Sequence, residues 1–144
     1  MWTDEHTLTT AAGRDAIWAL YADVTAWLQW DRGLVSVTID GPFAAGTSGT
    51  LEPIGQDPLP FTLTEATPGV GFTDETPIPG AILRFIHRLE PAGNGTRITH
   101  RLEIDGPAAD AIGPTLGPAI TADFAEAVEA LAALAMAMAP AGAI

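Results

Sequence analysis

The sequence predicts an α+β fold in which an antiparallel sheet of seven strands packs against one long C-terminal helix. Three observations predict this class. Seven segments alternate polar and apolar residues and are bounded by Gly, Pro or Asn, which is typical of strands joined by turns. A helical pattern separates the first segment from the other six, and an Ala-rich stretch with apolar residues three or four apart follows the last. At 144 residues the chain has the length of one domain, and we expect a single domain over residues 1–144.

The N-terminal part is expected to contain one strand and two short helices. The strand covers residues 2–10, a stretch rich in β-forming residues whose even-numbered positions we assign to the core. Apolar residues within 17–24 then recur at spacings of three and four, which predicts a helix. A second, shorter helix is expected over residues 25–30.

Six further strands follow in series, which indicates an antiparallel meander. They are expected at about 34–40, 49–54, 60–67, 70–76, 81–90 and 96–105. Beyond them the steps Gly113-Pro114 and Gly117-Pro118 are expected to break the chain before one helix from about 118 to 138. The apolar stripe of this helix needs a sheet to cover it, and Phe124 of this stripe is a candidate ligand-binding residue.

Charge and composition exclude several classes of function. Eighteen acidic and six basic residues give a net charge of −12, so we expect no nucleic-acid partner. All the basic residues are Arg, which excludes Schiff-base chemistry on Lys, and the absence of Cys excludes thiolate nucleophiles and disulfides. The first residues lack the features of a signal peptide, and the uncharged stretch 130–144 contains Pro140 and is too short to span a membrane. We therefore expect a cytoplasmic protein with no membrane span.

Five phrases of the sequence carry a resemblance to a known family. They are AIWALYADV at 16–24, WLQWD at 27–31, GTSG at 46–49, GTRITHR at 95–101 and IDGP at 104–107. With the order of elements, they make nearly the whole chain similar to the START-like superfamily, also called SRPBCC or helix-grip proteins, and most closely to its polyketide cyclase/dehydrase-like family. The resemblance implies a curved sheet that wraps the C-terminal helix and leaves a hydrophobic cavity between them. Members include lipid carriers, hormone receptors, aromatase/cyclases and chaperone activators, so the fold does not choose a function.

Short turns predict the pairing of three hairpins. A type II turn at 67–70 places Leu63 opposite Asp74 and Glu65 opposite Phe72. A turn at 77–80 then places Asp74 opposite Leu83 and Phe72 opposite Phe85. These pairings put the apolar residues of the strands on one inner face.

The third turn, at 91–95, places His87 opposite His100 on the same inner face. The residues predicted to line the cavity from the sheet are Phe61, Leu63, Phe72, Leu83, Phe85 and Leu102, with Glu65, Asp74, His87 and His100 between them. The opposite face carries Arg84, Arg88, Arg97 and Arg101 with Glu75, Glu90 and Glu103, which predicts a solvated surface of ion pairs rather than an anion site.

His87 and His100 are the candidate catalytic residues. Opposed positions lie about 4.5–5.5 Å apart, so the two rings can act together, and a neutral imidazole pair can accept or relay a proton as general acid and base. The alternative is a structural role in which a neighbouring group satisfies each ring. A metal site would need His6 and a carboxylate as well, but no HxH or HExxH spacing supports it, and we expect neither metal nor cofactor.

Two carboxylates are predicted near the imidazoles. Asp74 lies about 13 Å along the sheet from His87, whereas Glu65 lies roughly 11–12 Å from it, so Glu65 and His87 are expected to hold opposite ends of one ligand. The alternative for both acids is that a β-bulge or a sheet edge turns them to water.

Two tryptophans complete the predicted lining. Trp27 and Trp30 flank the second helix, which in the superfamily helps to close the cavity, although large aromatic residues also pack in ordinary cores. The Gly-Pro steps either open as a gate or cap the helix rigidly.

The predicted function is the binding of a small hydrophobic molecule, aromatic or polyketide-like, by a monomer or homodimer. In one form His87 and His100 catalyse cyclisation or dehydration of the ligand. In a second the protein is a lipid or small-molecule carrier or sensor without catalysis. In a third it is a protein-interaction module like the chaperone activators, which would have a filled interior and an exposed apolar patch.

Overall fold

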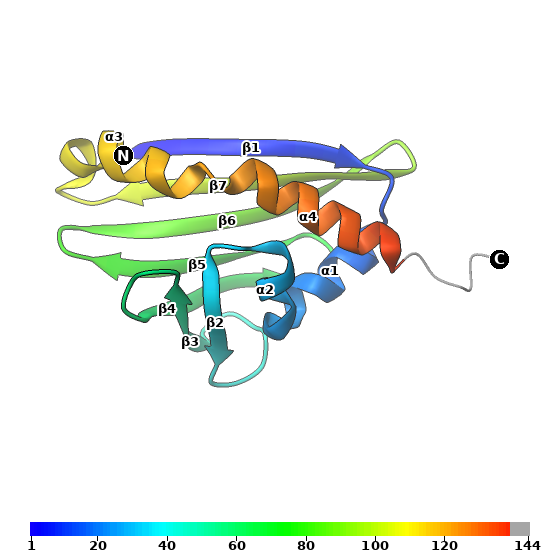
Figure 1. The fold of residues 1–144 in the computed structure, drawn as a ribbon, viewed down its shortest axis with the longest axis horizontal. Helices are drawn as coiled ribbons and strands as arrows, with labels where there is room; N and C mark the ends of the chain where they lie inside the picture. Colours follow the sequence, from blue (N-terminus) through cyan, green and yellow to red (C-terminus); the bar gives the residue numbers. More distant parts are fainter. Residues whose placement is uncertain (139–144) are drawn as a thin grey trace.

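Seven antiparallel strands form one curved sheet in the computed structural model of the protein, which describes residues 1–138 (Figure 1). The strands are β1 (Trp2–Thr10), β2 (Leu34–Ile39), β3 (Ser48–Pro53), β4 (Leu59–Thr67), β5 (Gly71–Ile78), β6 (Ala81–Ala92) and β7 (Gly95–Asp105). Their order in the sheet is β1-β7-β6-β5-β4-β3-β2, so the last six form the predicted meander and β1 pairs with β7. Residues 139–144, the end of the predicted domain, lie outside the described residues.

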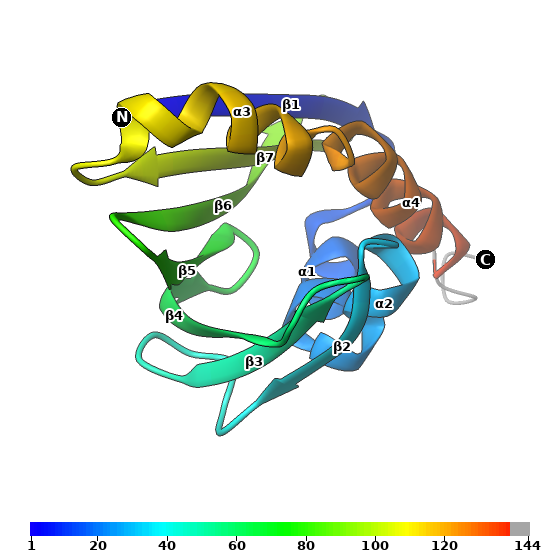
Figure 2. The same ribbon diagram turned by 60° about the vertical axis from the view of Figure 1, so that its left-hand side comes forward.

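The helices lie inside the bend of the sheet. They are α1 (Arg14–Ala22), the 3-10 turn η1 (Val24–Ala26), α2 (Trp27–Trp30), α3 (Ala109–Thr121) and α4 (Phe124–Ala137). Figure 2 shows the sheet curving from β1 and β7 round to β3 and β2, with α3 and α4 along one arm and α1 and α2 between the arms. The predicted helix-grip arrangement is confirmed. No helix in the described part of the chain is long and apolar enough to cross a membrane.

The C-terminal helix begins earlier than the sequence predicts. Helix α3 starts nine residues before the expected position 118 and runs through both Pro114 and Pro118. The break falls instead at Ala122 and Asp123, where α3 ends and α4 begins, so the long helix is bent.

Close packing on β1 explains why the helix continues through the Gly-Pro steps. A Cβ atom at Gly113 would lie 2.5 Å from Cβ of Trp2, and one at Gly117 would overlap the six-membered ring of Trp2. The two glycines therefore let α3 approach the sheet directly over this side chain. That contact holds the segment helical although each proline removes one backbone hydrogen bond. The Gly-Pro steps are thus part of a packed helix in this structure.

The hairpin formed by β6 and β7 has the predicted register. His87 lies opposite His100, and Phe85 opposite Leu102. The hairpin formed by β5 and β6 is shifted by two residues, so that Asp74 lies opposite Phe85 instead of Leu83. The strands continue to Ile78 and Ala81 and turn only at residues 79 and 80. Because the shift is even, every side chain keeps its predicted face.

The inner-face placement of Glu65 is wrong. Leu63 lies opposite Asp74 as predicted, but a β-bulge between Leu63 and Glu65 places Glu65 opposite Thr73 instead of Phe72. The extra residue turns Glu65 to the outer face, where its carboxylate lies 2.8 Å from a guanidinium nitrogen of Arg88.

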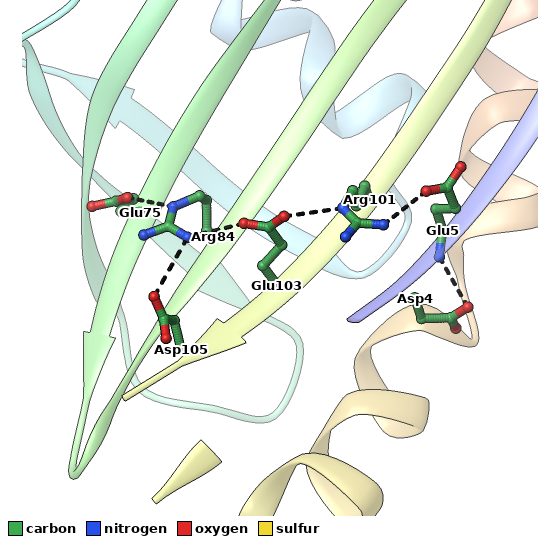
Figure 3. Close-up of polar contacts among 7 residues, drawn as sticks. All are labelled: Asp4, Glu5, Glu75, Arg84, Arg101, Glu103 and Asp105. Carbon is green, nitrogen blue, oxygen red and sulfur yellow. Dashed lines mark hydrogen bonds and ion pairs between the residues drawn. The ribbon is translucent and has the colours of Figure 1, made fainter. Parts of the chain in front are cut away.

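The outer face of the sheet carries the predicted ion pairs. Arg84 bridges Glu75 and Glu103 at 2.7 and 2.9 Å, and Arg101 bridges Glu103 and Glu5 at 3.1 and 2.8 Å. The residues of this ladder come from β5, β6, β7 and β1 (Figure 3). Each carboxylate in this ladder has a basic partner, as expected for a solvated surface of ion pairs.

Candidate functional site

A cavity of about 610 Å³ lies between the inner face of the sheet and helices α2, α3 and α4. Of the residues predicted to line it, eight do so: Trp27, Trp30, Asp74, Leu83, Phe85, His87, His100 and Phe124. Four others, Phe61, Leu63, Phe72 and Leu102, are on the inner face but are buried in the core. Glu65 lies on the outer face. The presence of this cavity disagrees with the filled interior expected of an interaction module.

The two tryptophans are both cavity walls and core residues. The indole N–H of Trp27 donates to the backbone oxygen of Tyr21 at 2.8 Å, and that of Trp30 donates to the backbone oxygen of Leu20 at 3.4 Å. The last turn of α1 thus anchors both rings of α2, and both side chains are buried. Their satisfied polar atoms leave the rings as rigid apolar surface beside the cavity.

His87 and His100 lie together at one end of the cavity, with ring centroids 4.7 Å apart. The ring of His87 stacks on Phe72 at 3.8 Å, and its Nδ1 lies 3.2 Å from the backbone oxygen of Phe72. Because a carbonyl can only accept, Nδ1 carries the hydrogen, and the other nitrogen, Nε2, is left as an acceptor.

Tyr21 completes this group and was missed by sequence reasoning. Its hydroxyl shares a hydrogen bond of 2.8 Å with Nε2 of His100, and both side chains are buried. A signal existed: Tyr21 is the only tyrosine of the chain and lies on the apolar face of α1, where a buried hydroxyl needs a partner. The identity of that partner, 79 positions away, depends on how α1 is placed on the sheet.

Burial keeps both imidazoles neutral. It lowers the pKa of His87 to about 3, and the positive charge of Arg88 contributes in the same direction. The pKa of His100 is also well below its ordinary value, first because of burial and then because His87 and His6 lie nearby. At neutral pH the pair therefore presents hydrogen-bonding nitrogens rather than positive charge to the cavity.

Asp74 is the carboxyl group of the inner face. Its side chain is 3% exposed, it lines the cavity, and it has no hydrogen-bond partner among the described residues. Burial raises its pKa to about 8, and the charges of Asp31 and Glu75 add to this shift. A buried acid with such a pKa in a cavity is typical of functional sites.

The observed register brings Asp74 closer to the imidazoles than predicted. Asp74 lies opposite Phe85, and Phe72 lies opposite His87, so Asp74 and His87 are diagonal neighbours on adjacent strands. Such neighbours are about 7–8 Å apart, against the 13 Å expected from the sequence. One small molecule can therefore contact both side chains.

A second buried polar group lines the cavity beside Asp74. Thr76 is 1% exposed, and its hydroxyl is the one fully buried side-chain polar atom without a hydrogen-bond partner in residues 1–138. It lies two residues from Asp74 on the same face of β5 and opposite Leu83. No pattern in the sequence distinguishes this residue, because an isolated Thr in a strand is common.

The mouth of the cavity carries further acidic residues. Arg32 and Glu126 form an ion pair of 2.9 Å between the loop after α2 and the first turn of α4. Asp31 and Asp123 lie beside it, and the pKa of Asp31 is raised, mainly by burial and further by the charge of Asp123, against the hydrogen bond from the Gly33 N–H. Asp31 directly follows Trp30 in one of the phrases that carry the resemblance, which was an unused signal.

No metal centre is visible in the described residues. His6 lies opposite His100 in the register of β1 and β7, but residues 1–138 contain no group of three or more His, Asp or Glu side chains placed to hold an ion.

Comparison with known proteins points to one family. Residues 1–136 match the profile of the family described as "Polyketide cyclase / dehydrase and lipid transport". No curated protein matches the sequence.

Solved structures of low sequence identity share the fold. The protein TTHA0849 of Thermus thermophilus has a TM-score of 0.74 at 12% identity, over 96% of this chain and 99% of its own. The di-domain ARO/CYC StfQ from the steffimycin biosynthetic pathway has a TM-score of 0.77 at 12% identity, over 95% of this chain and 51% of its own. Norcoclaurine synthase from Thalictrum flavum has a TM-score of 0.71 at 14% identity, over 93% and 86%. At these identities the likeness concerns the fold alone.

Proposed function

Because the chain belongs to the polyketide cyclase/dehydrase and lipid transport family, we propose that its cavity binds a small, largely apolar molecule of aromatic or polyketide-like kind. The observation that carries this proposal is the cavity itself, with about 610 Å³ of space. Its walls include Trp27, Trp30, Leu83 and Phe85. The volume is within the range of small-molecule sites, in which apolar walls supply most of the affinity and a few polar groups fix the orientation.

The polar groups of this site are placed to orient a ligand. His87 Nε2 accepts a hydrogen bond, and Asp74 donates or accepts according to whether its carboxyl holds a proton. The two side chains are diagonal neighbours, so two polar atoms of one molecule reach both. His100 is held from behind by Tyr21 and keeps the end of the cavity rigid.

A test of binding uses one substitution inside the cavity and one outside it. Leu83→Trp fills the cavity and should abolish the fluorescence enhancement of N-phenyl-1-naphthylamine, an uncharged probe of apolar sites. Ile82→Trp is the matched control, because Ile82 is the neighbouring residue of β6, is 38% exposed and lies outside the cavity lining. Equal probe binding by both variants would contradict the proposal.

Catalysis of cyclisation or dehydration is the second candidate function, and the pKa of Asp74 favours it. Both reactions need protons to move between a substrate and a group that titrates near the working pH, and the pKa of Asp74 is about 8. His87 has a pKa of about 3, so its ring is uncharged at neutral pH and has no extra proton to give to a substrate. We therefore assign the acid–base role to Asp74 and reduce His87 and His100 to orienting groups.

The substrate needed to test catalysis can be found with the protein itself. Native mass spectrometry of the protein purified from its own host should detect the small molecule that it carries. With that molecule at saturating concentration, Asp74→Asn should lower turnover by about 100-fold or more, and His87→Gln by less. Chemically unchanged ligand after incubation with the unmodified protein would leave the carrier or sensor function and exclude the catalytic one.

A further inference from the structure

We propose that the ligand of this cavity carries a basic nitrogen, which binds as an ammonium ion between Asp74 and Thr76. This inference rests on the proposed function and names the chemical class of the molecule that the cavity accepts.

The first step is the charge balance of the cavity lining. Arg32 and Arg101 are the arginines among the residues that line the cavity within residues 1–138. The guanidinium group of Arg32 pairs with Glu126 at 2.9 Å. That of Arg101 pairs with Glu103 and Glu5 on the outer face, as Figure 3 shows. Neither cation is free to neutralise the cavity.

Three carboxyl groups of the lining remain without a basic partner among the described residues. They are Asp31, Asp74 and Asp123. The chain contains no lysine that could pair with them. Of these three, Asp74 is buried, and a buried carboxylate is costly without a counter-charge, so a cation brought by the ligand supplies the partner that the chain lacks. An anionic ligand, such as a fatty acid, would meet repulsion from these groups once Asp74 is ionised, at pH 8 and above.

The second step is the unpartnered hydroxyl of Thr76. It is 1% exposed and lines the cavity two residues along β5 from Asp74, on the same face. At about 3.3 Å per residue the two positions are roughly 6.6 Å apart along the strand. The Thr76 hydroxyl is fully buried, so a rotation about its Cα–Cβ bond is needed to turn it into the cavity, where one nitrogen can contact both oxygens. An ammonium group has three N–H donors and no acceptor, which suits a carboxylate and a hydroxyl oxygen together.

The third step is the coupling of binding to a proton. Since the pKa of Asp74 is about 8, its carboxyl holds a proton in most molecules at pH 7. An ammonium ion binds the ionised form, so its binding expels that proton. The apparent affinity for the ammonium ion should rise about tenfold per pH unit up to about pH 8 and then level off. It does so because the fraction of protein molecules with an ionised Asp74 rises tenfold per unit below the pKa and is nearly complete above it. A neutral ligand has no such dependence.

The experiment compares three molecules of the same shape by isothermal titration calorimetry on the full chain. The probes are 1-naphthylmethylamine, 1-naphthalenemethanol and 1-naphthoate. At pH 8 the amine should bind about tenfold or more tightly than the alcohol, as expected for a charge-assisted hydrogen bond, and the carboxylate should not bind measurably. Between pH 6 and pH 8 the affinity of the amine should rise by up to about 100-fold, with release of one proton below pH 8.

Matched variants locate the effect. Asp74→Asn should abolish the preference for the amine and its pH dependence. Glu90→Gln removes a carboxylate that pairs with Arg97 on the outer face and lies outside the cavity lining, and should leave both unchanged. Thr76→Val keeps the shape of the side chain but removes its hydroxyl, and should lower the affinity for the amine severalfold.

Three outcomes would overturn the inference. Equal affinity of amine and alcohol at pH 8 would do so while leaving the proposed binding function intact. If the Asp74→Asn variant still bound the amine more tightly than the alcohol, the ammonium group of the ligand would not lie at Asp74. Failure of all three probes and of N-phenyl-1-naphthylamine would count against the proposed function as well. The pH series is measured on the unmodified protein, so its result does not depend on whether any variant folds.

Discussion

The carboxyl of Asp74 holds a proton at neutral pH in the folded protein but loses it in the unfolded chain. Burial raises its pKa from the ordinary 3.8 to about 8. Between these two values the folded state binds more protons than the unfolded state, so the contribution of Asp74 to stability falls as the pH rises. The slope is up to about 1.4 kcal/mol per pH unit for one proton. The carboxyl of Asp74, which lines the cavity, therefore lowers the free energy of unfolding as it ionises.

Substitution of Asp74 should reveal this cost. Asp74→Asn keeps the shape but cannot ionise, so its free energy of unfolding relative to the unmodified protein should increase steadily from pH 5 to pH 8. Urea unfolding at four pH values measures the difference. His87, whose pKa is lowered to about 3, affects stability in the opposite direction below pH 6.5, but both proteins share it and it cancels. A difference that stays constant over this range would contradict the raised pKa.

Single residues could be predicted from the sequence where a short turn determined their partners. His87 and His100 were found in this way, because the hairpin of β6 and β7 pairs regularly along its length. Glu65 was misplaced because a β-bulge leaves no clear mark in the sequence. The contact of Tyr21 with His100 joins a helix to a distant strand, and alternation along either element contains no information about it.

Helix α3 depends on two positions where only glycine fits. We expect Gly117→Ala to destabilise the protein by about 1–3 kcal/mol, the usual cost of an overpacked contact, because the added methyl would overlap the ring of Trp2. Gly41→Ala is the control: Gly41 is not among the glycines of positive φ, and an added Cβ would lie 3.6 Å from Cγ2 of Thr47, an ordinary van der Waals contact. The alanine there should be neutral or slightly stabilising. Equal midpoints of thermal unfolding for the two variants would show that α3 does not pack closely on β1.

Elements were predicted well where alternation or helical spacing decides them, and less well where packing does. All seven strands occur at the expected places, because strands half covered by a core must alternate. The start of the C-terminal helix was misplaced because proline ordinarily ends or kinks a helix. Here the fit of Gly113 and Gly117 against Trp2 outweighs that preference, and this fit appears only once β1 lies under α3.

The whole molecule carries its charge unevenly. The outer face of the sheet pairs its acids with arginines, whereas the cavity and its mouth keep acids without basic partners, and the sum is a net charge of −12. Such an excess of one sign opposes the compact state through self-repulsion, and salt screens that repulsion. The ion pairs of the outer ladder are partly exposed and contribute little each, so their weakening in salt is the smaller effect.

We therefore expect the midpoint of thermal unfolding to rise when sodium chloride is increased from roughly 20 mM to roughly 500 mM at pH 7. A variant with Asp40→Asn, Asp57→Asn and Glu129→Gln removes three exposed negative charges and should respond less, because it has less repulsion to screen. Effects of salt on apolar hydration are the same for both proteins, so the difference between their responses isolates the electrostatic part. An equal rise in both would mean that self-repulsion does not limit the stability of this protein, and a fall would mean that the ladder of ion pairs outweighs the net charge.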